Sequence, residues 1–411
     1  DPGPAVTGTG YFCDTTGGAF TVTLPLSPSA GDVVGVSDYA KTWDTDNLTL
    51  GRNGSNINGN ALDSVISTEG LAVTLVYVDA TKGWIVTDTG LQSDAPGPVY
   101  VAATGGTPCS GAIVCTNYKV HTFTGPGTFC VSCAGNCAGS NTVDYLVSAG
   151  GGGAGGSDDA GCNRAGGGGA AGGFRESPGA ASGCYSVSPL GASPAVALSV
   201  PVQGYPITVG SGGTGGEKAT PAAATNGNNS VFSTITSAGG GSGGTGIGGP
   251  AGISGDGADG GSGGGGSGGG SGTSSAAGDG NTPPVSPAQG TNGATGSNPP
   301  GTGGGGGGAT VAGTVSPGVT VGGGGGAGAT TSISATPTTY NGGGGGGGGS
   351  GPGSPGPGGG AAGSAANDGQ NAGTVNTGGG GGGAGFGPES SANSYGGAGG
   401  SGIVIIRYKF Q

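Results

Sequence analysis

Residues 341–350 read NGGGGGGGGS, an unbroken run of eight glycines with a polar residue at each end. Glycine supplies 115 of the 411 residues, and 93 of these glycines come after residue 150. Further unbroken runs are Gly303–Gly308, Gly322–Gly326 and Gly378–Gly383. Ordering a glycine costs roughly 1–2 kcal/mol of backbone entropy, and no side chain offsets that cost. Such a composition is typical of disorder unless backbone hydrogen bonds hold the runs together.

Polyglycine II is the conformation that we predict for these runs. It has the polyproline II geometry of three residues per turn, so its N–H and C=O groups point outward in three directions. Glycine, which has no Cβ, lets such helices lie close enough for each to bond several neighbours. A silk-like flexible spacer is one alternative. A collagen-like triple helix is another, and the lack of a sustained Gly-X-Y period disfavours it.

Segments rich in Pro, Ser, Thr, Asn and Ala separate the runs, at residues 281–302, 309–320, 327–341 and 350–377. We expect these linkers to turn the chain and to gather at the two ends of a stack. Recognition usually lies on surface loops of a rigid scaffold. The loops are therefore where we look for recognition, although the sequence does not specify which residues bind a partner.

Short runs of alternating apolar and polar residues fill residues 19–90, and Leu71–Val78 is the strongest of them. We predict a small all-β module at residues 19–90, preceded by an extended segment at residues 1–18 and followed by a linker at residues 91–117. A module of this size needs a partner or a staple. The two tryptophans, Trp43 and Trp84, adjoin strands, so we interpret them as core anchors rather than sugar-stacking platforms.

A second β region begins near Tyr118, and the apolar run Ile403–Phe410 ends the chain. Because an apolar terminal strand would not remain exposed, we predict that it pairs with the strands of residues 118–147. Residues 118–411 then form one glycine-rich domain, with a β base (118–149 and 402–411) and a polyglycine excursion (150–401). The predicted fold class is mainly β plus polyglycine II, with very little α-helix.

Charge disfavours several kinds of partner. The net charge is −12, and no Lys or Arg stands between Lys218 and Arg407. Phosphate binding needs clustered cations, so nucleic acid and anionic membranes are poor partners. No apolar run approaches the roughly 20 residues that span a bilayer, so we predict no membrane insertion. The chain has no Met, and we expect an attachment segment to precede Asp1.

Eight cysteines suggest structural disulfides and an oxidising, extracellular setting. They are Cys13, Cys109, Cys115, Cys130, Cys133, Cys137, Cys162 and Cys184. Buried free thiols are a second possibility. The third is a metal held by Cys130-x-x-Cys133-x-x-x-Cys137 with the nearby Cys109, Cys115 and His121; it is the least favoured, and we predict no metal site.

No motif indicates catalysis. Gly-x-Gly-x-x-Gly matches follow from the composition, and none follows a strand with the acidic residue of a dinucleotide site. The single histidine, His121, lies in an alternating strand beside Phe123, which favours a structural role. Asp158-Asp159 lacks further ligands for calcium. We therefore predict no enzyme activity, no catalytic or cofactor-binding residues and no cofactor.

Residues 20–88 resemble a module that is repeated in bacteriophage tail fibres. The resemblance lies in Leu24-Pro25, Ser27–Asp32, Asp38-Tyr39, Asn47–Leu50, Arg52–Gly59 and Leu75–Trp84. In that family such modules form trimeric fibre shafts or knobs, so the resemblance implies a homotrimer.

Residues 118–411 look like the glycine-rich domain at the ends of phage fibres and in some bacterial surface proteins. The resemblance lies in Val120–Gly125, Val143–Val147 running into Gly150, Ile207–Gly210 and Gly402–Tyr408. Some phage adhesins of this kind fold such segments as stacked polyglycine II helices, with tip loops that contact the host receptor. The eight cysteines depart from the pattern.

Together the resemblances imply a fibre on the virion surface that attaches a phage to its host. The expected partners are a glycan or outer-membrane protein receptor, and other virion proteins reached through the preceding segment. Three weak tips on one particle would gain avidity without new contacts. A bacterial extracellular filament or surface adhesin is the alternative, and a capsid fibre or decoration protein is a further one. A glycan-degrading enzyme is disfavoured, because no pair of carboxylates stands out.

Overall fold

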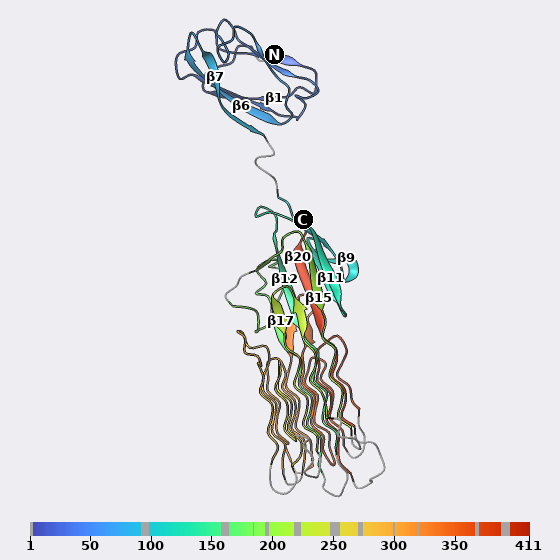
Figure 1. Ribbon diagram of the computed structural model, residues 1–411. Coiled ribbons are helices and arrows are strands. Elements are labelled where there is room, and N and C mark those ends of the chain that lie inside the picture. Colours follow the sequence, from blue (N-terminus) through green and yellow to red (C-terminus); the bar gives the residue numbers. More distant parts are fainter. Residues whose placement is uncertain are drawn as a thin grey trace. The chain divides into compact units, whose positions relative to one another are not determined.

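The computed structural model describes residues 3–91, 98–157, 164–183, 185–193, 197–217, 223–246, 255–269, 274–298, 301–318, 320–365, 370–387 and 395–411. Every regular element in these ranges is a β-strand, which confirms the predicted mainly β fold with very little α-helix. The chain divides into two compact units, Asp1–Gly97 and Pro98–Gln411. We call them the N-terminal unit and the second unit (Figure 1).

The N-terminal unit contains two sheets. A four-stranded sheet has the order β1-β3-β6-β7, and a three-stranded sheet has the order β2-β4-β5. Their bounds are β1 Thr9–Cys13, β2 Phe20–Thr23, β3 Val33–Asp38, β4 Leu48–Gly51, β5 Ser64–Ile66, β6 Leu71–Asp79 and β7 Gly83–Leu91. Trp43 and Trp84 are both fully buried in the core of this unit, so their interpretation as core anchors is confirmed.

Two predicted boundaries were wrong. Residues 1–18 are not a separate extended segment, because β1 pairs in parallel with β3 and buries Cys13 in the core. The linker does not reach residue 117, because β8 (Val101–Thr104) and β9 (Thr107–Val114) belong to the second unit. Gly105 and Gly106, which suggested a linker, have φ of 124° and 69° and redirect the chain from one sheet to another.

The second unit has a base of two open sheets. One has the order β13-β12-β20-β10-β9, with β14 paired to β12, and the other has the order β17-β16-β15-β11-β8. The bounds are β10 Tyr118–Phe123, β11 Gly127–Ala134, β12 Thr142–Ser148, β13 Phe174–Glu176, β14 Leu198–Ser199, β15 Gly204–Thr208, β16 Ser230–Phe232, β17 Ile235–Ser237 and β20 Ile403–Lys409. The C-terminal strand β20 lies between β10 and β12 and is antiparallel to both, as predicted.

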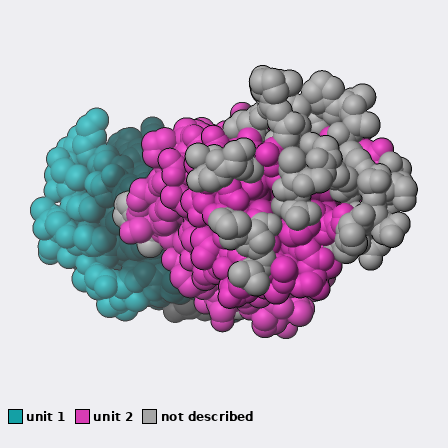
Figure 2. Space-filling model, turned by 90° about the horizontal axis from the view of Figure 1, so that it is seen from below, with its two compact units in different colours: residues 1–97 teal, residues 98–411 magenta. Residues whose placement is uncertain are grey.

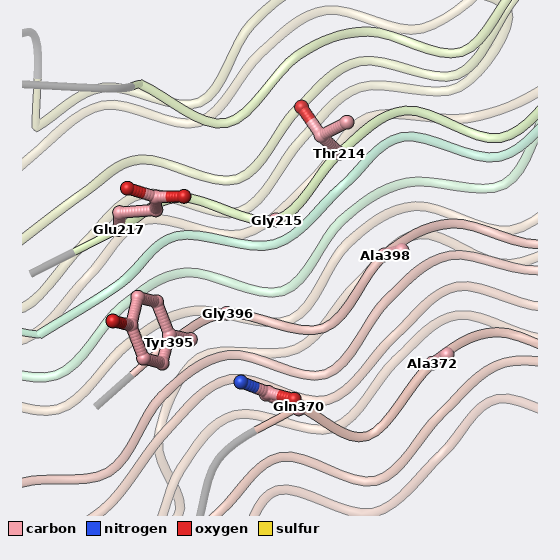
Figure 3. Close-up of a pocket in the computed structure, with 8 residues that line it drawn as sticks. All are labelled: Thr214, Gly215, Glu217, Gln370, Ala372, Tyr395, Gly396 and Ala398. Atoms are coloured by element: carbon pink, nitrogen blue, oxygen red, sulfur yellow. The ribbon is translucent and has the colours of Figure 1, made fainter. Parts of the chain in front are cut away.

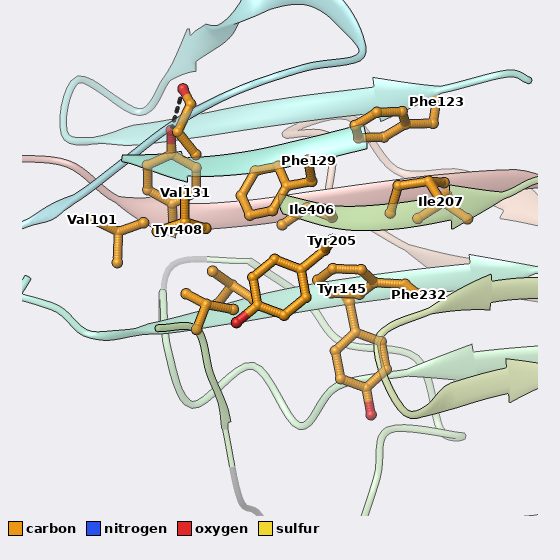
Figure 4. Packing of buried hydrophobic residues seen from close by; sticks show 14 of the residues in the cluster. Val101, Phe123, Phe129, Val131, Tyr145, Tyr205, Ile207, Phe232, Ile406 and Tyr408 are labelled. Carbon is orange, nitrogen blue, oxygen red and sulfur yellow. Dashed lines mark hydrogen bonds between the residues drawn. The ribbon is translucent and has the colours of Figure 1, made fainter. Parts of the chain in front are cut away.

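An aromatic core fills the base. Phe129, Phe232 and Tyr408 are fully buried, and Tyr145 and Tyr205 are almost so. Figure 4 shows these rings packed together, with residues from β11, β15 and β16 meeting residues from β12 and β20. Phe129 and Phe232 meet edge to face with ring centroids 6.1 Å apart. Both ends of the polyglycine region are therefore anchored in one hydrophobic core.

The stack below the base consists of extended segments joined by backbone hydrogen bonds (Figure 1). In residues 165–173, successive amides donate to three neighbouring segments in strict rotation, at 2.7–2.9 Å. Residues 165, 168 and 171 donate to 301, 304 and 307; residues 166, 169 and 172 to 384, 381 and 378; and residues 167, 170 and 173 to 244, 241 and 238. A repeat of three is the polyglycine II geometry.

Three further segments donate to the carbonyl groups of the same helix. Their donors include Gly265, Gly344 and Gly152, which bond to residues 168, 169 and 170 at 2.8–2.9 Å. The helix therefore has six bonded neighbours, three as acceptors and three as donors. A Cβ built on Gly166 to Gly169 would lie only 1.9–2.2 Å from a neighbour's carbonyl oxygen. This close approach explains why the sequence places glycine there.

The linkers turn the chain at both ends of the stack, but one of them is not a free loop. Residues 327–341 contain a hairpin of β18 (Ala329–Thr331) and β19 (Thr338–Tyr340). Its tip residue Ile333 is fully buried in a cluster with Val120 and Ile405 of the base. This linker is therefore partly structural, because its apolar residue packs on the base.

Candidate functional site

A surface depression of about 510 Å³ lies at the end of the stack opposite the base, which we call the far end. Four polar or aromatic side chains line it, from Thr214, Glu217, Gln370 and Tyr395. Its remaining lining comes from small residues, namely Gly215, Ala372, Gly396 and Ala398. We call these eight residues the Tyr395 depression, and Figure 3 shows their side chains on neighbouring segments of the stack.

Three polyglycine II-type segments form the depression: residues 210–217, 370–375 and 395–402. Hydrogen bonds fix their register, because the amide of Gly396 donates to the carbonyl oxygen of Gly216 at 3.0 Å. On the other side, the amide of Gln370 donates to the carbonyl oxygen of Tyr395 at 3.1 Å. These hydrogen bonds hold the lining residues in fixed positions relative to one another, although the residues are far apart in sequence.

The floor of the depression depends on glycine. A Cβ at Gly215 would lie 1.8 Å from the carbonyl oxygen of Gly396, so a larger residue would push the two segments apart. The carboxylate of Glu217 and the side chains of Gln370 and Thr214 are exposed above this floor, and the ring of Tyr395 is half-buried. None of the eight lining residues is Lys, Arg or His.

A second depression, of about 450 Å³, lies where the stack meets the base. Its lining is mainly small and apolar, including Pro189, Leu190, Ala288 and Ala309. The nearby side chain of Gln289 is almost fully buried; its Nε2 donates to the carbonyl oxygen of Pro283 at 2.9 Å and its Oε1 accepts from the amide of Ala238. The part of linker 281–302 beside the base therefore has a structural role.

Figure 2 looks onto the far end of the second unit, whose described residues are magenta. The linker at residues 350–377 contributes Gln370 and Ala372 to the Tyr395 depression.

The acidic pair Asp158-Asp159 lies outside the described residues. Within the described ranges, no three His, Cys, Asp or Glu side chains gather as a metal site requires.

His121 is fully buried, and its ring packs edge to face on Phe129 of β11 and stacks on Tyr408 of β20. Nδ1 lies 2.7 Å from the carbonyl oxygen of Gly105, and Nε2 lies 3.0 Å from the hydroxyl of Tyr408. A carbonyl oxygen only accepts, so Nδ1 carries the proton, and the Tyr408 hydroxyl lies between Nε2 and the carbonyl oxygen of Ala103, to which it donates at 3.5 Å. Burial lowers the pKa of His121. These contacts are those of a structural residue.

A buried polar cluster ties the hairpin to the base. Asp144 accepts hydrogen bonds from the Ser177 hydroxyl and the Ser182 amide, both at 2.8 Å. The guanidinium of Arg407 lies 5.2 Å from the centroid of the Tyr185 ring and donates to the carbonyl oxygen of Ile333 at 3.2 Å. Burial raises the pKa of Tyr185, and the Asp144 carboxylate raises it further. Sequence reasoning missed this cluster, because its members come from distant parts of the chain.

No disulfide joins the six cysteines in the described residues, so the disulfide prediction is not confirmed for them. Cys13 is buried, Cys133 is partly buried, and Cys109, Cys115, Cys130 and Cys137 are exposed. The remaining two, Cys162 and Cys184, lie outside the described residues.

The fold and this surface define a class of protein: an all-β base that carries a rigid polyglycine II stack. Residues 123–409 match the glycine-rich domain family, and the chain belongs to that family. No curated protein matches the sequence significantly. Among the described residues there is no helix with the length and apolar character that crossing a bilayer requires.

Proposed function

We propose that this chain is a fibre protein of a phage virion that attaches the particle to the surface of its host. The six bonded neighbours of helix 165–173 carry the proposal. Backbone hydrogen bonds hold the helices of the stack so close together that almost no side chains fit between them. The side chains that could contact a partner therefore lie on the surface of the stack and at its ends. Such a body is suited to presenting groups at a distance from an anchored base. In this proposal the polyglycine II stack serves as a rigid spacer and as a display surface.

A homotrimer is part of the proposal, and the outer face of the four-stranded sheet supports it. Phe12 is 79% exposed on the edge strand β1. Across the sheet it is in register with Ser37, Ala72 and Gly90, all small and uncharged. An exposed ring beside a flat row of small residues suits packing against another copy. A chain of net charge −12 would be expected to associate through an uncharged surface.

Labelling of virus particles tests the function. Antibodies raised against the second unit should label the tail fibres in electron micrographs, and purified full-length protein should reduce adsorption of the particles to their host. Label on the capsid would instead support the capsid fibre. Label on filaments of uninfected cells would overturn the virion proposal in favour of the bacterial filament or adhesin.

A further inference from the structure

We propose that a row of Asn and Asp side chains closes one face of the stack, so that the polyglycine II helices of another copy of this chain cannot add to it. The side chains are all exposed, and hydrogen bonds link the four segments that carry them. We call them the Asx row: Asn226, Asn229, Asp256, Asp259, Asp279 and Asn292. The row governs how copies associate, so its role does not depend on the attachment function.

The geometry of polyglycine II explains why such a face needs closing. Each helix directs its amides and carbonyl groups outward in three directions, so a helix at the surface of the stack has amides that no further helix accepts. Unpaired amides in a row can pair with another chain, as those on the exposed edge of a β-sheet do. Another copy carries the same glycine runs with the same three-residue repeat. Since each added copy would present its own open face, association would continue without closing.

Two aspartates accept from one surface segment. The amide of Ala276 donates to Oδ1 of Asp256 at 2.7 Å. The amide of Asp279 donates to Oδ1 of Asp259, also at 2.7 Å. Acceptors and donors are each three residues apart, which is the repeat of the helix. The amide of Gly278, between the two donors, bonds to a backbone carbonyl oxygen instead. The carboxylates therefore stand where the carbonyl groups of a further helix would accept.

Two asparagines repeat the arrangement on another pair of segments. The amide of Ser242 donates to Oδ1 of Asn226 at 2.8 Å. The amide of Gly239 donates to Oδ1 of Asn229 at 2.9 Å. Acceptors and donors are again three residues apart, although these two segments run in opposite directions. The same spacing in two separate pairs indicates that the side-chain caps follow the repeat of the helix.

Further hydrogen bonds join the caps into one row. Nδ2 of Asn226 donates to the carbonyl oxygen of Asp259 at 3.1 Å. Nδ2 of Asn292 donates to Oδ1 of Asp279 at 3.0 Å, and its Oδ1 accepts from the amide of Gly280 at 2.8 Å. Because Asn226 and Asn292 are each held by two hydrogen bonds, their side chains resist displacement by another helix.

Charge adds to this closure. Three of the five carboxylates in residues 219–406 belong to the row, namely those of Asp256, Asp259 and Asp279. Two copies that met through this face would bring like charges together, and like charges repel. Capping and repulsion lead to different expectations for a change of Asp to Asn, which keeps an acceptor oxygen and removes the charge.

The test compares two double variants of the full-length protein. Asp256→Ala/Asp259→Ala removes both acceptors. Asp256→Asn/Asp259→Asn is the matched control, because it loses the same charge and keeps both acceptors. The amides of Ala276 and Asp279 should be protected from hydrogen exchange in the wild type and the control, and should exchange at least about tenfold faster in the alanine variant, since hydrogen bonds to charged groups are the stronger ones. Sedimentation velocity at rising protein concentration should show larger species for the alanine variant alone.

The proposal is wrong if the two amides are unprotected in the wild type or equally protected in the alanine variant. It is also wrong if they exchange faster in that variant and no larger species form. Larger species for the asparagine variant as well would assign the effect to charge and overturn the capping. If circular dichroism shows that the double alanine variant does not fold, Asp259→Ala against Asp259→Asn makes the same comparison at the exposed residue Asp279. Virus particles without label would refute the attachment function and leave these expectations unchanged.

Discussion

The amide of Gly169 donates to the carbonyl oxygen of Gly381 at 2.9 Å, although the two residues are separated by most of the glycine-rich sequence. The carbonyl oxygen of Gly169 accepts in turn from the amide of Gly344, also at 2.9 Å. Gly169 therefore joins segments that are remote in the chain. The stability of the stack depends on the absence of a Cβ at such positions.

Gly169→Ala should destabilise the second unit. The added Cβ would lie 2.2 Å from the carbonyl oxygen of Gly152, and backbone cannot move aside as a flexible side chain can. Overpacking of this kind costs typically about 1–3 kcal/mol. Far-ultraviolet circular dichroism during denaturant unfolding measures the change. Both tryptophans, Trp43 and Trp84, lie in the N-terminal unit, so tryptophan fluorescence should report an unaltered transition there.

Gly318→Ala is the control for this substitution, because a Cβ built on Gly318 meets nothing within 4 Å. Its effect should stay within about 0.5 kcal/mol, as is usual for surface substitutions. Equal stability of the two variants would contradict the close packing of the stack.

The pKa of His121 should lie below that of a free histidine, because burial of the ring disfavours the imidazolium. The unfolded chain then binds the proton first, at about pH 6.5. The contribution of His121 to stability is fully present above that pH and is lost as the pH falls toward its lower folded pKa. Burial raises the pKa of Glu176 and acts in the opposite sense, since its cost appears as the pH rises.

Nuclear magnetic resonance distinguishes the titration of His121 from that of Glu176. His121 is the only histidine, so the imidazole C–H resonances of the folded protein report this ring alone. We expect a titration midpoint below 6.5, and Tyr408→Phe should shift it because the hydroxyl partner of Nε2 is lost. A midpoint at or above 6.5 in the folded wild type would refute the assigned environment.

Residue patterns within short stretches of the sequence predicted the architecture. Contacts between stretches that are distant in the sequence could not be predicted. The apolar run Ile403–Phe410 needed a buried partner, and the run at residues 342–349 could be ordered only by other backbones, so both predictions held. Periodicity does not fix which segment lies beside which. The Tyr395 depression depends on that register, because Thr214, Gln370 and Tyr395 meet only after the stack has formed. The same limit explains why Ile333 was placed in a loop.

Phe12→Ser should weaken the proposed trimer. Burying a phenylalanine is worth about 1.5–3 kcal/mol, and each of three copies would lose this contribution at its interface. Light scattering at micromolar concentration should give a mass of three chains for the wild type and a lower mass for the variant. Leu62→Ser is the control, because Leu62 is 73% exposed and lies outside the four-stranded sheet. A wild-type mass of one chain would rule out the trimer, and a Phe12→Ser trimer as stable as that of Leu62→Ser would rule out this face.

Thiol labelling should distinguish Cys13 from the exposed cysteines. Burial, aided by the nearby Asp38 carboxylate, raises the pKa of Cys13 to about 11. Since the thiolate is the reactive form, Cys13 is both inaccessible and almost entirely protonated at pH 8. Iodoacetamide at that pH should modify Cys109, Cys115, Cys130 and Cys137 in the native protein, as mass spectrometry of the peptides would show. Cys13 should react only after unfolding in guanidinium at the same pH. Labelling of native Cys13 as fast as Cys109, or recovery of either in a disulfide, would contradict this arrangement, because each requires a thiol environment that the fold does not provide.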